Sequence, residues 1–385
     1  MDDRALMVLA FGQVSLLEIY SILQKRLLHA EMICDRVASV HFASIEANQI
    51  ERLAGIHKFA SPAAVIDDHD YEESIAIFVK KILDYYDDIP NVSVSSYCEG
   101  DSSLSYDEVV ASVLTNMRRM GFRKTNLLRP RNHELTADEV LSRRALDFVD
   151  AASDRRHLVA TTIFVPDSEA FRQRGMHRPV PSSGIALSPR LAKTLVNLSG
   201  LSKGETLLDP FCGSGTIISE GALLSLNCIG LDASPARVAQ AKRNLAWLEK
   251  QSAKDLSYHI ETGDARNLEG IPRVDGIVTE PILLPRFNST PSPRKAKELV
   301  RNAARIYSES LYSMAKVVRK GGRIVIVVPT VKTTDGSEVL LRLEGMDRIG
   351  FKEFQPGQTR FVYPLRVSFE STRWVGRCVY VFERT

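Results

Sequence analysis

The segment from Asp209 to Thr216 places one acid and two glycines at a spacing that suits the binding of a cationic nucleoside. Gly213 and Gly215 let the backbone turn sharply and approach a ligand without a clash from a β-carbon. A carboxylate at Asp209 would repel the pyrophosphate of a dinucleotide, whereas the amino-acid end of S-adenosylmethionine carries a cation. The segment therefore predicts an S-adenosylmethionine site rather than a site for an anionic nucleotide.

Two further acids follow at the ends of later apolar runs. Asp232 lies about 20 residues after the glycine turn, where a carboxylate commonly accepts hydrogen bonds from ribose hydroxyls. Asp264 could reach the amino group of an adenine. A single acid at a strand end often only caps a helix, but three in order predict a rim around a cofactor. The predicted cofactor-binding residues are Asp209, Phe211, Gly213, Gly215, Thr216, Asp232, Asp264 and Ala265.

These residues can meet only if a parallel sheet brings the strand ends to one edge. Apolar runs predict strands, and helical spacing over 216–224 predicts a helix directly after the glycine turn. A strand, a tight turn and a helix form the first half of a βαβ unit. The fold class predicted is α/β, a doubly wound, Rossmann-like sheet with an antiparallel edge. The predicted strands are 205–208, 228–232, 258–261, 274–278, 323–328 and 373–383.

Composition sets limits on the class of protein. The 385 residues suggest two or three domains, and 25% charged with 44% hydrophobic residues is typical of globular chains. The net charge of +3 is only weak support for a polyanionic partner. No apolar run could span a bilayer and residues 1–3 do not begin a signal peptide, so a cytoplasmic location is predicted. No metal site is predicted, because the five cysteines are scattered singly: Cys34, Cys98, Cys212, Cys228 and Cys378.

Two modules are predicted upstream of the cofactor-binding part. Residues 1–60 contain a strand, a helix and a partly alternating stretch, 31–42, and a polar stretch near residue 65 opens a second α/β module. A connector rich in Arg and Pro then leads into the cofactor-binding part. The boundaries predicted are 1–64, 65–168, a linker at 169–182, and 183–385.

One window of the second module is strongly basic and holds no acid. Guanidinium groups grip phosphate oxygens bidentately, so the window predicts contacts with a nucleic-acid backbone. A solvated helix face is the alternative, although such a face normally interleaves acids. Only Tyr106 and Phe122 are aromatic nearby, so recognition of folded RNA fits better than stacking of single-stranded bases. The predicted RNA-binding residues are Arg118, Arg119, Arg123, Lys124, Arg129 and Arg131.

Several motifs together resemble the archaeal and eukaryotic family of tRNA guanosine-10 N2-methyltransferases. The likeness rests on the cofactor turn, on the linker Arg174–Val180 with Ser183–Gly184 and Leu187–Ala192, and on Arg52–Lys58. In that family the linker covers the methionine end of the cofactor. The resemblance implies a ferredoxin-like module, a THUMP-like RNA-binding domain and a Rossmann-like methyltransferase domain. It also implies S-adenosylmethionine as cofactor and tRNA as substrate.

The family's catalytic motif is Asp or Asn followed by Pro, Pro and Tyr at the end of the fourth strand. Here the predicted strand 274–278 runs into Thr279, Glu280 and Pro281, so Glu280 takes the place of the acid and Pro281 matches the first proline. The second proline and the aromatic residue are absent. Phe287, slightly downstream, is a candidate for the missing ring that would hold a flipped base.

The chemistry implied by the resemblance is the methylation of an exocyclic guanine amine. That amine is a poor nucleophile because its lone pair is delocalised into the ring. A carboxylate at Glu280 and the carbonyl of Pro281 could accept its N–H bonds and direct the lone pair toward the methyl group. Glu280 and Pro281 are therefore the predicted catalytic residues.

Three functions stay open from the sequence. The first is methyl transfer to guanosine N2 in tRNA, at position 10 by the resemblance. The second keeps the reaction but acts on ribosomal RNA or on an adenine amine. The third is an RNA-binding module that has lost the reaction, because the aromatic residue is missing at Ile282 and Leu283. Family members can also depend on a small zinc-ribbon activator subunit that pairs with an exposed sheet edge, so such a partner is a further expectation.

Overall fold

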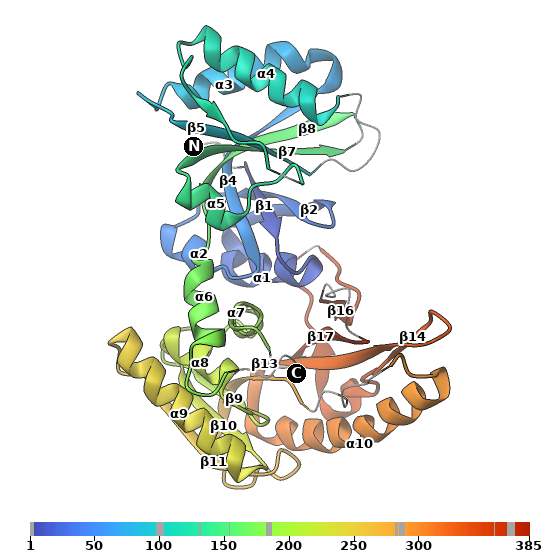
Figure 1. Ribbon diagram of the computed structural model, residues 1–385. Coiled ribbons are helices and arrows are strands. Elements are labelled where there is room, and N and C mark those ends of the chain that lie inside the picture. Colours follow the sequence, from blue (N-terminus) through green and yellow to red (C-terminus); the bar gives the residue numbers. More distant parts are fainter. Residues whose placement is uncertain are drawn as a thin grey trace. The chain divides into compact units, whose positions relative to one another are not determined.

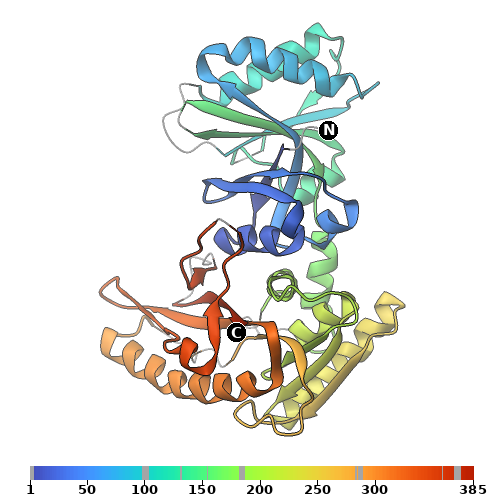
Figure 2. The same cartoon turned by 180° about the vertical axis from the view of Figure 1, so that it is seen from behind.

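The computed structural model is shown from two opposite sides (Figure 1, Figure 2). The chain divides into two compact units, Met1–Ser168 and Glu169–Thr385. The structure describes residues 4–97, 104–130, 132–153, 155–181, 187–281, 284, 289–357, 359–367 and 374–385.

The first unit is built on one continuous sheet with the strand order β2-β3-β1-β4-β8-β7-β5-β6. Its strands are β1 Arg4–Leu9, β2 Leu27–Cys34, β3 Val37–Phe42, β4 Ile56–Asp67, β5 Asn91–Ser96, β6 Asn126–Leu127, β7 Ala145–Ser153 and β8 Arg156–Phe164. Its helices are α1 Gln13–Leu23, α2 Ala47–Arg52, α3 Tyr71–Leu83, α4 Tyr106–Arg119 and α5 Ala137–Ser142, with short 3₁₀ turns at Gln24–Arg26 and Asp68–Asp70.

Strand β4 runs through residue 65, where the sequence suggests a boundary between two modules. β4 pairs with β1 on one side and with β8 on the other, so the two predicted modules share a sheet. The alternating stretch 31–42 also differs from expectation, because it forms a hairpin of β2 and β3 and not one strand. Asp35 and Arg36 make the turn between them, and polar residues at a turn carry little periodic signal.

Helices α3 and α4 cover one face of the second half of this sheet (Figure 1). Their apolar sides join Val92, Val94 and Phe148 from the strands in one buried cluster. The N-terminus of α4 is fixed by a capping box, in which Ser105 Oγ accepts from the Glu108 backbone N–H and Glu108 accepts from that of Ser105. The helix therefore presents its C-terminal end, with Arg118 and Arg119, at a defined place on the sheet.

A buried ion pair lies beneath this sheet, between β4 and β7. Lys58 and Asp147 are both fully buried, and Lys58 Nζ lies 2.7 Å from Asp147 Oδ2. Ser93, Ser95 and Thr162 donate further hydrogen bonds to the same carboxylate. Because every acceptor position is filled, the charge on Asp147 is stabilised only while these partners stay in place.

Replacing Lys58 by methionine is expected to lower the free energy of unfolding by about 3–5 kcal/mol, since the buried Asp147 charge loses its counter-ion. Urea unfolding followed by circular dichroism measures this loss. The double variant Lys58→Met, Asp147→Leu should recover much of the stability, and the exposed Lys80→Met should change little. A loss below about 1 kcal/mol in the single variant would show that the pair does not matter for stability.

The second unit contains a sheet with the strand order β11-β10-β9-β12-β13-β17-β15. Its strands are β9 Thr206–Asp209, β10 Asn227–Asp232, β11 Tyr258–Thr262, β12 Val274–Thr279, β13 Val318–Lys332, β14 Glu338–Leu340, β15 Phe351–Glu353, β16 Leu365–Arg366 and β17 Val375–Arg384. Its helices are α6 Ser168–Met176, α7 Pro189–Leu198, α8 Thr216–Leu223, α9 Pro235–Ser252 and α10 Pro293–Val317, with a 3₁₀ turn at Met346–Ile349.

The strands from β11 to β13 are parallel, and β17 pairs antiparallel with β13. This order confirms the Rossmann-like sheet with an antiparallel edge that the sequence predicts. α9 packs against β10 and β11, and α10 packs against β13 (Figure 1). The carboxyl ends of β9, β10, β11 and β12 therefore share one edge of the sheet, where ligands bind in folds of this kind.

Candidate cofactor and catalytic site

The glycine turn between β9 and α8 has the conformation that its sequence suggests. Gly213 and Gly215 have φ angles of 53° and 86°, which disfavour residues with a side chain. A β-carbon on Gly215 would lie 3.2 Å from the side chain of Ala241, so α9 also packs too closely for a larger residue. The Cys212 N–H donates to the Leu231 carbonyl at 2.7 Å, which ties the turn to the end of β10.

Asp209 is the most deeply buried acid of this edge, with 1% of its surface exposed. Its Oδ1 accepts from the Phe211 N–H at 3.1 Å and from the Thr279 hydroxyl at 2.7 Å. Within the described part of the chain its Oδ2 accepts no hydrogen bond. Burial raises the pKa of Asp209 to about 7, against the opposing effect of these two donors. A cation placed at Oδ2 would favour the charged carboxylate.

Asp232 lies at the end of the neighbouring strand β10 and is half-buried. Its Oδ2 accepts from the Gly213 N–H at 3.0 Å, and its Oδ1 accepts from the Ser234 N–H at 2.9 Å. A carboxylate has about four lone-pair positions, so both oxygens can still accept from hydroxyl groups. The structure thus brings Asp232 directly beside the glycine turn.

Asp264 follows β11 at the same edge but is engaged by a neighbour. Both of its oxygens accept from the Arg266 guanidinium at 2.6–3.0 Å, and these bonds lower its pKa. Ala265 beside it is buried. An adenine amine would have to share the Asp264 carboxylate with Arg266, whereas Asp209 and Asp232 have no such competitor within the described residues.

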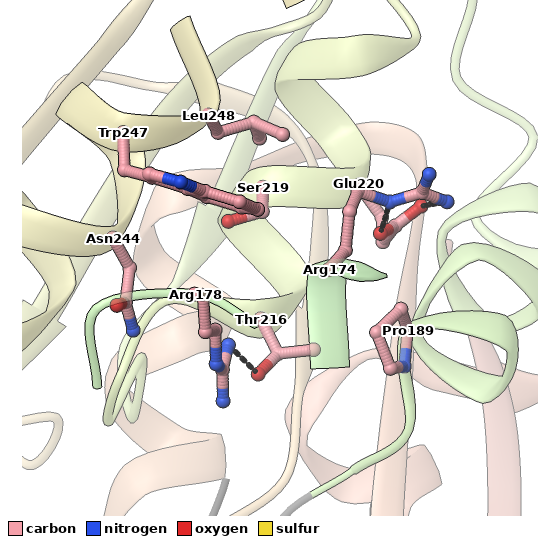
Figure 3. Close-up of a pocket in the computed structure, with 9 residues that line it drawn as sticks. All are labelled: Arg174, Arg178, Pro189, Thr216, Ser219, Glu220, Asn244, Trp247 and Leu248. Carbon is pink, nitrogen blue, oxygen red and sulfur yellow. Dashed lines mark hydrogen bonds and ion pairs between the residues drawn. The ribbon is translucent and has the colours of Figure 1, made fainter. Parts of the chain in front are cut away.

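The linker before α7 is attached to the cofactor turn by side chains whose partners the sequence did not indicate (Figure 3). Buried Arg178 donates to the hydroxyls of Thr216 at 2.9 Å and Ser214 at 3.1 Å. Asn244 of α9 bonds the backbone of Val180 in both directions and also the Ser214 carbonyl. Thr216 is predicted to bind the cofactor, but it is only 7% exposed and its hydroxyl already accepts a hydrogen bond from Arg178.

Arg174 forms the second attachment of the linker, to the buried Glu220 of α8 (Figure 3). Its guanidinium donates twice to the carboxylate, at 2.7 and 3.1 Å. These residues border a small pocket that is open to solvent. The lining of this pocket contains none of the three acids and shares only Thr216 with the predicted cofactor-binding residues. Its lining is Arg174, Arg178, Pro189, Thr216, Ser219, Glu220, Asn244, Trp247 and Leu248.

Glu280 directly follows β12, one residue after Thr279, which bonds to Asp209. Its side chain is 11% exposed, and its Oε1 accepts from Arg377 Nε of β17 at 2.6 Å. Burial raises the pKa of Glu280, while Arg377 acts in the opposite direction. Its Oε2 accepts no hydrogen bond in the part of the chain described. Sequence reasoning missed Arg377 because the two residues lie 97 positions apart.

The other residues of this loop can be placed only in part. Pro281 is buried, and Ile282, Leu283 and Phe287 lie outside the described residues, as do Ser183 and Gly184 of the linker motif.

Two nearby side chains bear on the chemistry. Phe211 is half-buried in the turn, in line with a contact to a ligand. Cys212 is buried, and burial raises the pKa of its thiol far above the usual range, which disfavours a nucleophilic thiolate.

The basic segment lies in the first unit, at the end of α4 and in the chain that follows. Arg118, Arg119, Arg123 and Lys124 are exposed and have no acidic partner within the described residues. Arg129 is exposed too, and pairs with Asp107 at 2.9 Å. Arg131 and Cys98 lie outside the described residues. Four of the six predicted RNA-binding residues thus offer unpaired charges to solvent.

Neither aromatic residue near this segment is available for stacking on a base. Tyr106 stacks on His133 with ring centroids 3.9 Å apart, and Phe122 packs against the core under α4. This arrangement fits contacts with a phosphate backbone better than base stacking.

Comparison with known proteins agrees with this geometry. A family described as RMKL-like, methyltransferase domain, matches residues 178–337. The tRNA (guanine(10)-N2)-dimethyltransferase of Methanothermobacter thermautotrophicus is 31% identical over 175 residues, which cover 45% of this chain and 48% of that protein. A probable tRNA (guanine(10)-N2)-dimethyltransferase of Methanothermococcus thermolithotrophicus is 34% identical over 140 residues, which cover 34% of this chain and 81% of that protein.

Among solved structures, TrmN from Thermus thermophilus matches with a TM-score of 0.57 and 18% identity, over 99% of this chain and all of that one. At that identity the likeness shows the fold. The chain spans about half the length of the Methanothermobacter relative.

Proposed function

The chain belongs to the family of tRNA (guanine(10)-N2)-methyltransferases, with an S-adenosylmethionine-dependent methyltransferase domain, and we propose that it methylates the exocyclic N2 of a guanosine in tRNA, at position 10. One observation carries the proposal. Thr279, the residue before Glu280, donates its hydroxyl to Asp209 at 2.7 Å, and this contact supports an acceptor site at Glu280 beside the predicted cofactor rim.

The residues of the rim fit the cofactor. Asp209 Oδ2 would face a cationic group of the amino-acid end, and Asp232 would accept from the ribose hydroxyls. Gly213 and Gly215 leave room for close approach of the backbone. When bound, S-adenosylmethionine supplies an electrophilic methyl group. The linker bonds of Arg178 and Asn244 hold the turn in one conformation, which lowers the cost of ordering it on binding.

Glu280 and Pro281 would orient the acceptor amine. Glu280 Oε2 and the Pro281 carbonyl would accept the two N–H bonds, and both lie at the end of β12. Arg377 donates to Oε1 and opposes the effect of burial, so it favours the carboxylate over the neutral acid. A charged acceptor holds the amine more strongly than a neutral one. The rate enhancement would come from orientation and from these hydrogen bonds.

The proposal is tested by incubating the protein and labelled S-adenosylmethionine with unmodified tRNA, and in parallel with unmodified ribosomal RNA, followed by mass analysis of the nucleosides. We expect N2-methylguanosine or N2,N2-dimethylguanosine. Label in a methylated adenosine, or only in ribosomal RNA, would contradict the proposed acceptor. Tight cofactor binding in calorimetry with no transfer to any RNA would favour a module that has lost the reaction.

We infer that the basic segment of the first unit binds tRNA. Replacing Arg123, Lys124 and Arg129 by serine is expected to weaken tRNA binding and to lower the slope of log K against log salt by about 2, because each lost phosphate contact removes nearly one unit and Arg129 is already paired. Filter binding at several salt concentrations measures the slope. A slope equal to that of the unsubstituted protein would place the RNA surface elsewhere.

A partner subunit and a location complete the proposal. Within the described residues β11 and β15 end the strand order of the second sheet. Four of the five residues of β11 are at least partly exposed, so β11 is the edge strand on which we expect a zinc-ribbon activator to pair.

We expect a cytoplasmic enzyme. In the part of the chain that is described, no helix combines the length and apolar character needed to cross a bilayer.

A further inference from the structure

Helix α10 carries a stripe of cations that the sequence did not single out. Arg294, Lys297 and Arg301 follow one another at spacings of three and four residues, so they lie on one side of the helix, and all three are exposed. We call these three residues the α10 stripe. The opposite side of α10 is apolar and packs on the sheet through Ala296, Val300 and other residues.

The acids of the same helix are already paired with other bases. Glu298 bonds Lys295 at 3.1 Å, and Glu309 bonds Arg305 at 2.8 Å. Over the described part of the chain, the α10 stripe therefore has no acidic partner. In the sequence these acids make the segment look like an ordinary mixed-charge surface, and only the pairing in the structure separates the three remaining cations from it.

The position of the α10 stripe along the helix is electrostatically unfavourable. The first turn of α10 holds no acid, and Arg294 lies in that turn, near the positive end of the helix dipole. Lys297 and Arg301 follow on the same side of the helix, so the three cations also repel one another. A bound polyanion would offset both effects.

The α10 stripe lies toward the start of α10, past the carboxyl end of β12. Tyr307, six residues after Arg301, donates its hydroxyl to the Val327 carbonyl at 3.0 Å, close to the level at which Thr279 pairs with Ile326. The chain passes from β12 through the loop after Glu280 into α10 and returns as β13, parallel to β12. The Thr334 N–H, just beyond β13, donates to the Pro291 carbonyl at 3.1 Å, which ties the start of α10 to the carboxyl end of β13. Figure 1 shows this end of α10 beside β14.

We propose that the α10 stripe binds the phosphate backbone of the substrate RNA beyond the carboxyl end of β12. This inference rests on the proposed function and adds a second RNA contact, within the methyltransferase domain itself. A protein partner is less compatible, because the first large exposed apolar side chain along the helix is Tyr312, eleven residues beyond Arg301, and protein interfaces need an apolar centre.

The test compares two triple variants of the full chain. Arg294→Ser, Lys297→Ser and Arg301→Ser together remove the stripe, and Lys242→Ser, Arg243→Ser and Lys250→Ser remove three exposed charges from α9. The stripe variant is expected to bind unmodified tRNA about 10–100-fold more weakly at low salt, with a slope of log K against log salt smaller by 2–3. The α9 variant should change affinity less than about threefold. Calorimetry with S-adenosylmethionine should give the same affinity for all three proteins.

Equal weakening by both variants would overturn the inference, since only overall charge would then matter. Unchanged tRNA binding by the stripe variant would overturn the inference as well. This holds also if the stripe variant loses the binding of a protein partner, because the stripe would then be a protein-binding surface. If the unsubstituted protein binds tRNA in a stripe-dependent way but transfers no methyl group, the proposed reaction fails while the RNA contact stands. If it binds no tRNA, both fail.

Discussion

Glu280→Ala is expected to lower the rate constant of methyl transfer by about 10²–10³-fold while leaving S-adenosylmethionine affinity nearly unchanged. Removing one pre-organised hydrogen-bonding group from an active site has effects of this size. Glu280 is the proposed acceptor of the amine N–H at the end of β12, and its oxygen Oε2 accepts no hydrogen bond from the described residues. Single-turnover transfer to tRNA, with cofactor at saturation, measures the step directly.

The alanine variant also leaves Arg377 without its partner, so a second substitution is needed. Glu280→Gln keeps an acceptor oxygen and a bond to Arg377 but removes the charge, and we expect an intermediate loss of about tenfold. Glu261→Ala, an exposed acid at the same edge, serves as the matched control. If the alanine variant keeps its cooperative unfolding and transfers methyl at the unsubstituted rate, Glu280 has no part in the reaction.

Asp209→Asn is expected to weaken cofactor binding by about 10–100-fold, since a hydrogen bond to a charged group contributes about 1.5–3 kcal/mol. The same substitution should stabilise the free protein. The folded pKa of Asp209 is about 7 and the ordinary value is 3.8, so the folded state binds this proton more tightly than the unfolded state. The protonated Asp209 carboxyl therefore contributes to the free energy of unfolding. This contribution is complete below pH 3.8 and is lost as the pH rises to about 7.

Asparagine does not ionise, so the free energy of unfolding of the Asp209→Asn variant should not fall in this way. The difference between the variant and the unsubstituted protein should therefore grow by about 1–3 kcal/mol from pH 5 to pH 8, at about 1.4 kcal/mol for each pKa unit. Urea unfolding at the two pH values and calorimetry with S-adenosylmethionine provide the two measurements. The exposed Asp255→Asn controls for loss of charge alone. Equal stability differences at both pH values would mean that Asp209 is ionised in the free protein, and unaltered affinity would exclude it from the cofactor site.

The parallel sheet and its acids could be predicted because the necessary signal is local. Each strand is a short apolar run, each acid directly follows one, and the φ angles of Gly213 and Gly215 follow from residue type. The same reasoning places Glu280 after β12. Partners distant in sequence carry no such signal. Arg377 for Glu280, Arg178 for Thr216 and Arg174 for Glu220 are defined only by the packed fold.

The sequence was least informative about strand turns, about the module boundary on β4, and about which charged side chains pair with each other. The alternating stretch that forms β2 and β3 did not show its turn, and β4 continues through the position suggested for a module boundary. The cations of α10 give no distinct signal in the sequence, because Glu298 and Glu309 lie among them and only the structure pairs these acids with Lys295 and Arg305. By contrast, the basic segment around Arg123 holds no acid at all, so the sequence alone could indicate its exposed charge.

A crystal structure of the protein with S-adenosylmethionine, or its demethylated product, tests the placement of the active site most directly. The amino-acid end should lie at Asp209 Oδ2, the ribose hydroxyls at Asp232, and the sulfur within reach of an amine held by Glu280. Density for the nucleoside at another place, such as the pocket beside Trp247, would contradict this assignment of the catalytic edge.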